Sequence, residues 1–288
     1  MNNLILRNSK GVEININNST PFVLQNFDIK NGININTSKG MQQDGVSYLN
    51  NNLDSKDITI TFTITTENIE ELNLLRNKLY NVCSPKLDLG ELIYKDDFKE
   101  MKIKFICNAL PVLEQETGQS YQKCTLNLLC PSPFWEDLEE IKKEIALWLN
   151  DLEFPLEVLK EGNIFGHREP NLIVNVINSG DITTGMTIKF RANGTVKNPT
   201  LTNINTQKFI KINSTMVAGQ EIIVNTNYNN KRVELIENGT ISNSFNLIDW
   251  ESDFLQLEVG DNLFRYNAES GLDNLNVDIY YNNKFWGV

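Results

Sequence analysis

Apolar and polar residues alternate along several stretches in the first half of the chain, the pattern of a β-strand with one buried face. The clearest stretch is residues 57–65, where isoleucine and phenylalanine take one phase and threonine the other. Residues 101–109 and 122–130 repeat the alternation, and two prolines at 131 and 133 end the last stretch because proline donates no backbone hydrogen bond. With a predicted hairpin over residues 4–16, these stretches predict a sheet.

One helix is predicted in the same half. Thr66 or Asn68 can cap its first turn, because each carries a side-chain oxygen that accepts from free backbone N–H groups. The apolar residues after them recur every three or four positions and form one stripe, which predicts that the helix covers the sheet. They are Ile69, Leu72, Leu75, Leu79 and Val82.

Residues 37–55 have no steady period. They are rich in glycine, asparagine, serine and aspartate, which predicts a long loop. Long loops in compact domains usually carry a function or move.

A charged segment follows Trp135. Leu138, Ile141, Ile145 and Trp148 are spaced by three or four residues, and the glutamates at its start suit a helix N-terminus. The pattern favours a short amphipathic helix packed between two domains, and a solvated charged connector is the alternative.

The second half consists of short apolar stretches separated by turn formers such as Asn193-Gly194 and Asn238-Gly239. Many short strands at nearly regular spacing predict an antiparallel sandwich or barrel. The chain is therefore predicted to be a mostly β protein with three parts: an N-terminal β-sandwich-like domain with one helix (1–135), a linker (136–164) and a C-terminal antiparallel β-sandwich (165–288).

The net charge of the chain argues against a protein that binds duplex DNA. The formal net charge is −11; residues 1–135 carry 13 basic and 15 acidic side chains, and residues 136–288 carry 13 and 22. Such a chain lacks the basic surface that binds phosphate backbones. It also contains no apolar stretch long enough to span a membrane, and no export signal is recognised at its start.

Residues with catalytic or metal-binding chemistry are sparse. The single histidine, His167, rules out a histidine-based metal cluster and lies outside any nucleophile motif. The four cysteines form no CxxC pair and are predicted to be reduced core residues. We therefore predict no catalytic, cofactor or metal site and no enzyme activity.

Aromatic residues in the second half leave two interpretations open. Trp250, Phe254 and Trp286 could stack on sugar rings or fill a core. Phe264 and Tyr266 share a phase with Ala268, which favours the core for both.

The order and spacing of several stretches resemble the siphophage distal tail protein family, which forms the hub of the tail-tip baseplate in long-tailed phages of Gram-positive hosts. The resemblance covers nearly the whole chain and rests on diffuse patterns rather than a catalytic signature. The stretches are GMQQDGVSYLNNNLDSKDITITFTI (40–64) with the helix after it, CPSPFW (130–135), INSGDITTGMTIKF (177–190), Asn198-Pro199, AGQEIIVNT (218–226), WESDFLQLEVGDNLFRYNAESG (250–271) and YYNNKFWGV (280–288).

This resemblance implies an assembly function. Family members form a hexameric ring from the N-terminal domain, with a galectin-like β-sandwich projecting from each subunit. The ring joins the tail tube and tape measure protein to a tail-associated adhesin, lysin or receptor-binding protein, and DNA passes through its lumen. The implied location is the virion tail tip, after synthesis in the host cytoplasm.

The long segment 37–55 is the predicted contact between neighbouring subunits. Its candidate interface residues are Gly40, Asp44, Gly45, Tyr48, Asn51 and Leu53. Two other functions compete with the hub: a carbohydrate-binding adhesin, which needs an exposed aromatic platform, and a wall hydrolase, which needs converging carboxylates.

Overall fold

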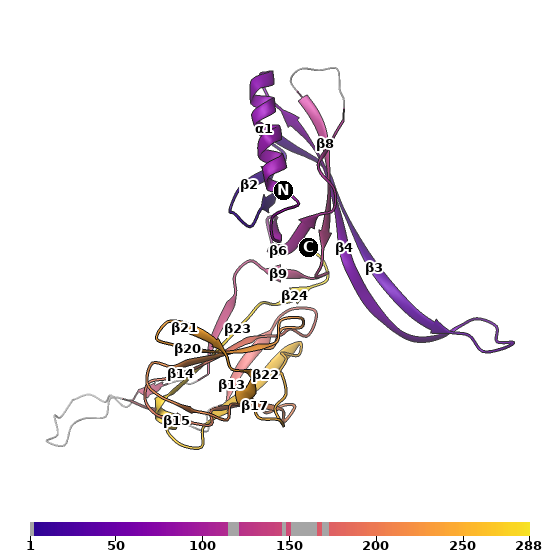
Figure 1. Ribbon diagram of the computed structural model, residues 1–288. Coiled ribbons are helices and arrows are strands. Elements are labelled where there is room, and N and C mark those ends of the chain that lie inside the picture. The colour runs from indigo at the N-terminus through magenta and orange to yellow at the C-terminus, as the bar shows by residue number, and fades with distance from the viewer. Residues whose placement is uncertain (1–2, 115–120, 146–147, 151–165, 169–172) are drawn as a thin grey trace. The chain divides into compact units, whose positions relative to one another are not determined.

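The computed structural model describes residues 3–114, 121–145, 148–150, 166–168 and 173–288. The chain divides into two compact units. Unit 1 comprises Met1–Leu138 together with Phe285–Val288, and unit 2 comprises Glu139–Lys284. Antiparallel strands make up most of both units (Figure 1).

Unit 1 contains a ten-stranded sheet whose main path runs β2-β1-β5-β6-β8-β4-β3, with β7, β9 and β24 at its margins. The strands predicted around residues 57–65, 101–109 and 122–130 are confirmed as β4, β6 and β8, and the predicted N-terminal hairpin is β1 and β2. The bounds are β1 (Asn3–Arg7), β2 (Glu13–Ile16), β3 (Phe22–Ser38), β4 (Ser47–Thr65), β5 (Gly90–Lys95), β6 (Glu100–Cys107), β7 (Val112–Leu113), β8 (Tyr121–Cys130), β9 (Trp135–Asp137) and β24 (Lys284–Phe285).

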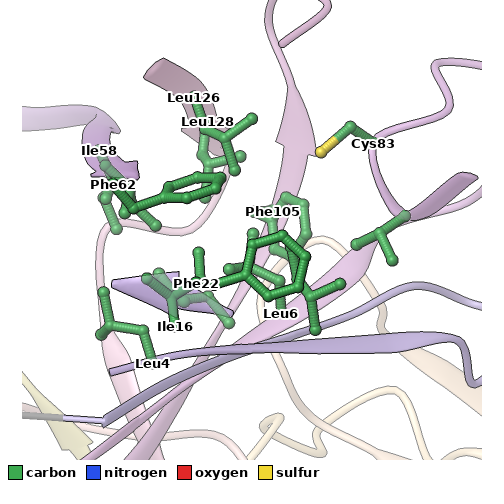
Figure 2. Close-up of a cluster of buried hydrophobic side chains, with 14 of the residues drawn as sticks. Leu4, Leu6, Ile16, Phe22, Ile58, Phe62, Cys83, Phe105, Leu126 and Leu128 are labelled. Atoms are coloured by element: carbon green, nitrogen blue, oxygen red, sulfur yellow. The ribbon is translucent and has the colours of Figure 1, made fainter. Parts of the chain in front are cut away.

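The predicted helix is confirmed as α1 (Ile69–Val82), and Asn68 is its N-cap. The Asn68 side chain accepts a hydrogen bond from the backbone N–H of Glu71, which satisfies one of the donors left free in the first turn. Leu72 and Leu79 are buried against the sheet side chains, several of which Figure 2 shows. One apolar core therefore joins the helix to the sheet.

The prediction of a loop at residues 37–55 is wrong. β3 and β4 continue through most of this segment as a paired antiparallel hairpin, which leaves only residues 39–46 between the strands. Figure 1 shows the two strands running together well beyond the rest of unit 1. Nearly all side chains in this part are exposed, so no alternation between apolar and polar residues marks β4 here, and on β3 the alternation is confined to a few residues around Ile33 and Ile35.

Unit 2 contains a six-stranded sheet (β10-β23-β14-β19-β20-β21), a four-stranded sheet (β13-β22-β16-β17) and the pairs β11-β12 and β15-β18. The bounds are β10 (Ile141–Glu144), β11 (Trp148–Asn150), β12 (Gly166–Arg168), β13 (Val174–Asn178), β14 (Thr187–Ala192), β15 (Val196–Lys197), β16 (Thr200–Asn203), β17 (Phe209–Lys211), β18 (Thr215–Met216), β19 (Glu221–Asn225), β20 (Arg232–Glu237), β21 (Thr240–Asn243), β22 (Gly260–Asn267) and β23 (Leu275–Tyr281), with short 3-10 helices η1 (Phe245–Leu247) and η2 (Leu272–Asn274).

Both larger sheets of unit 2 contribute side chains to one core. Phe190 and Val277 come from the six-stranded sheet, and Leu201 and Phe264 come from the four-stranded sheet. The predicted antiparallel sandwich is therefore confirmed. The β20–β21 turn is Asn238-Gly239 with φ of 48° and 78°, the left-handed pair that a two-residue hairpin turn requires.

The helix predicted in the linker is wrong where the structure describes it. Residues 141–144 form β10, which pairs with β23, and Trp148 lies on β11. The buried Ile145 donates its backbone N–H to the Val277 oxygen at 2.8 Å. Pairing with a strand far along the chain therefore overrides the local helical spacing. Residues 151–164 of the predicted linker lie outside the described residues.

Candidate assembly interface

The β3–β4 hairpin separates from the sheet at Lys56. β4 pairs with β8 from Thr65 back to Lys56, whose partner Cys130 is the last residue of β8. Pro131 follows, and a proline cannot continue the ladder. Beyond this point β3 is the one described strand that pairs with β4, and we call residues 31–55 the arm.

The arm exposes apolar side chains at its tip and on both strands. Ile35 and Tyr48 are each 61% exposed, and Met41 at the tip is 99% exposed. Ile33, Val46 and Leu49 are also exposed. A two-stranded ribbon of this kind has no core of its own and is marginally stable in water. Exposed large apolar side chains gathered on one protruding ribbon are candidates for contact with a partner.

Polar side chains hold the arm together along its length. Asn36 donates to Asn50 across the strands at 2.6 Å. At the tip, Gln43 accepts from the backbone N–H of Gly40 at 2.9 Å and donates to Ser47 at 3.1 Å. These contacts fix the register of the ribbon and leave the apolar side chains free for a partner.

A buried lysine lies at the root of the arm. Lys56 is 0% exposed, and its Nζ donates to the backbone oxygen of Trp286 at 3.0 Å and lies 5.7 Å from the centre of the Trp135 ring. Burial lowers the pKa of Lys56 to about 8. The Phe134 and Trp286 rings meet edge to face at 5.4 Å, so the C-terminal residues of unit 1 cover the point from which the arm extends.

Two protein-family descriptions match successive parts of the chain. Residues 9–130 match the phage tail protein RIFT-related domain, and residues 179–285 match the C-terminal domain of the siphovirus-type tail component. The chain belongs to the siphophage distal tail protein family.

Solved structures agree with this assignment at the level of the fold. The SPP1 Dit (gp 19.1) protein, described as a paradigm of the hub adsorption apparatus in phages that infect Gram-positive hosts, superposes with a TM-score of 0.68 at 13% identity, covering 98% of this chain and 99% of that chain. A chain of the phage P2 baseplate in its activated conformation with calcium superposes with a TM-score of 0.58 at 13% identity over 100% of both chains. No curated protein sequence matches the chain. As a member of this family, the distal tail protein is a component of the phage tail.

The predicted interface residues of this distal tail protein all lie on the arm. Gly40, Asp44 and Gly45 lie at the tip, and Tyr48, Asn51 and Leu53 lie on β4. Gly45 has a φ of 80°, a conformation that glycine adopts without strain. Their role in subunit contact stays a prediction.

Sequence reasoning missed the partner strand of the arm. Ile33 and Ile35 on β3 lie opposite Leu53 and Asn51 and are among the most exposed aliphatic side chains in unit 1. The alternation of asparagine and isoleucine over residues 31–36 was the available signal, because period-two spacing predicts a strand.

Several chemical features of the described residues bear on other functions. No group of three histidine, cysteine, aspartate or glutamate side chains within them could hold a metal ion, and no helix among them is long and apolar enough to cross a membrane. All four cysteines are free thiols. Burial raises the pKa of Cys124 and of Cys130 to about 12, so both sulfurs are poor nucleophiles.

The aromatic residues singled out in the sequence of the distal tail protein have different positions. Phe264 and Tyr266 are buried in the core of unit 2, as predicted. Phe254 is partly buried against that core, and Trp250 is exposed. Trp286 belongs to unit 1. They do not form one shared platform within unit 2.

Proposed function

We propose that this distal tail protein assembles into a closed hexameric ring at the tail tip. In this proposal unit 1 (Met1–Leu138 with Phe285–Val288) forms the ring, and unit 2 (Glu139–Lys284) is a galectin-like sandwich carried by each subunit. The arm of each copy packs on the next copy. Because the arm and the surface that receives it are different parts of the subunit, the contact is head-to-tail and produces a ring when its rotation closes.

The exposed apolar arm is the observation that carries this proposal. Isolated ribbons are marginal in water, and unprotected strands with apolar side chains tend to associate. The side chains of Ile33, Ile35, Met41, Tyr48 and Leu49 are exposed to water, and packing against a neighbouring subunit would remove that contact. Burial of each large apolar side chain contributes about 1.5–3 kcal/mol, so burial of several of them together can offset the cost of association.

The proposed hub joins the tail tube and tape measure protein on one side to an adhesin, lysin or receptor-binding protein on the other, and DNA passes through its lumen. These partners come from the family resemblance. Residues 1–135 carry 13 basic and 15 acidic side chains, so the proposed ring has no excess of positive charge to which passing DNA would adhere. The proposed role is structural and requires no catalytic residue, and its place is the virion tail tip after synthesis in the host cytoplasm.

The first test is the solution mass of the full chain by light scattering over a concentration series. One chain has a mass of 32.9 kDa, so a hexameric ring has a mass of about 200 kDa. A monomer at every concentration, both alone and mixed with the tail tube protein of the same phage, would contradict the proposal.

Substitutions in the arm test how the ring closes. Ile35→Asp places a charge in the proposed contact and is expected to shift the mass to that of the monomer. Ile241→Asp is the matched control, because Ile241 is a similarly exposed isoleucine on strand β21 of unit 2. Equal masses for the two variants would show that the arm does not close the ring.

A further inference from the structure

Three aromatic rings and a lysine form a row on unit 2. The Nζ of Lys231 lies 5.8 Å from the centre of the Tyr228 ring and 4.9 Å from that of Phe254. The Phe254 ring stacks on Phe245 with centroids 5.9 Å apart and planes 26° apart. We call Tyr228, Lys231, Phe254 and Phe245 the aromatic row. Its residues come from the turn before β20, from η1 and from the segment before β22.

Packing in the core of unit 2 does not explain why these side chains lie together. Phe254 packs partly against the core, whereas Tyr228 is 66% exposed and Phe245 is 48% exposed. Lys231 forms no ion pair with any described residue, and the contacts found for its ammonium group are with the two ring faces. Attraction between a cation and a ring face orders these side chains before any ligand binds, and ordering in advance lowers the cost of binding.

Amide side chains border the row. The turn that carries Tyr228 contains Asn227, Asn229 and Asn230, and Asn229 has a left-handed φ of 64°. The side-chain amide of Asn229 makes no hydrogen bond with any described residue. An amide offers two donors and an acceptor, which is the set that a ligand rich in hydroxyl groups needs.

We propose that the aromatic row binds a polysaccharide chain. A sugar ring has an apolar face of C–H groups and a polar rim of hydroxyl groups. Its face matches the exposed rings of Tyr228 and Phe245, and its rim matches the Asn229 amide and the Lys231 ammonium group. A protein partner fits less well, because protein interfaces have a contiguous apolar core with charge depleted at its centre, and here a cation lies inside the row.

This binding site is independent of the ring proposed above. The row lies wholly on unit 2, whereas the arm lies on unit 1. A distal tail protein with both features would anchor the tail tip and also hold a glycan, and each function can be lost without the other.

Affinity electrophoresis of the full chain tests the site. Native gels are cast with soluble hydroxyethyl cellulose, laminarin, dextran or pullulan, and the mobility of the protein is compared with that in a gel without polymer. The native protein is expected to be retarded by at least one polymer. Retardation by none of the four would overturn the proposal.

Substitutions then assign the binding to the row. Tyr228→Ala and Lys231→Gln change exposed side chains and are expected to weaken the apparent affinity at least tenfold. Phe98→Ala is the control, because Phe98 is a highly exposed phenylalanine of unit 1 and its loss should leave the retardation unchanged. Equal retardation of Tyr228→Ala and Phe98→Ala would refute the assignment. Light scattering of the same variants reports ring formation separately.

Discussion

Substitution of Lys56 by methionine tests how unit 1 tolerates a buried ammonium group. The Lys56 side chain is fully buried, and its Nζ has one protein acceptor, the backbone oxygen of Trp286. Methionine has a similar length and no charge. The substitution therefore removes the charge and this hydrogen bond while it keeps most of the packing.

The magnitude follows from the pKa of Lys56, which burial lowers from 10.5 to about 8. Each pKa unit corresponds to about 1.4 kcal/mol, so keeping the charged form in the folded protein costs about 3 kcal/mol. Below pH 8 the folded and unfolded states both bind the proton, and the full cost is present. Between pH 8 and 10.5 only the unfolded state stays protonated, so the stability of the native protein rises with pH.

The hydrogen bond from Lys56 to Trp286 stabilises the folded native protein by about 1 kcal/mol, and Lys56→Met loses this contribution. We therefore expect Lys56→Met to be more stable than the native protein by about 2 kcal/mol at pH 7. Above pH 10.5 the order reverses, and the variant is less stable by about 1 kcal/mol. Cys130 interacts electrostatically with Lys56, and Asp57 interacts electrostatically with Cys130. Both groups are present in the native protein and in Lys56→Met.

Urea unfolding at pH 7 and at pH 10.5 measures the effect. Tryptophan fluorescence reports on this region, because the fully buried Trp135 lies beside Lys56. Lys104→Met is the control, since Lys104 is an exposed lysine of the same sheet and its loss should change stability equally at both pH values. Parallel pH profiles for the native protein and Lys56→Met would refute the reasoning.

Three further expectations can be checked directly. Asn68→Ala removes the cap of α1 and should destabilise unit 1 by about 1 kcal/mol in urea unfolding; an unchanged midpoint would contradict the capping role. Gly271→Ala should prevent unit 2 from folding, as judged by circular dichroism, because the residue has a φ of 76° and an added Cβ would lie 1.9 Å from the Thr195 oxygen. Cys124 and Cys130 should stay unmodified by maleimide at pH 8 until the protein unfolds, as measured by mass spectrometry. Rapid labelling of the native protein would show that burial does not protect them.

The sequence predicts structure wherever one face of an element is buried. β4 is recognisable over residues 57–65 because Ile58, Ile60 and Phe62 all point into the core. The same strand continues back to Ser47 in the arm, where both faces contact water and the alternation disappears. The sequence therefore marks residues 37–55 as a distinct segment but predicts the wrong conformation for it, and its role in subunit contact stays a prediction.

Contacts between distant segments account for the other differences. The spacing of Ile141 and Ile145 is compatible with a helix, and only pairing with β23, more than a hundred residues later, makes the segment a strand. The aromatic row likewise joins Tyr228, Phe245 and Phe254, whose proximity depends on the turns between them. Local periodicity carries no information about such contacts.

The residues Phe285–Val288 pack with unit 1 although they follow the whole of unit 2. Ribosomes make a chain from its N-terminus, so residues 1–138 emerge before the segment that covers Lys56 exists. During that interval Lys56 lacks the Trp286 carbonyl group, and Phe134 lacks its ring partner. Unit 1 therefore finishes its packing only after unit 2 has been translated, and a nascent chain that stops before Phe285 leaves the root of the arm uncovered.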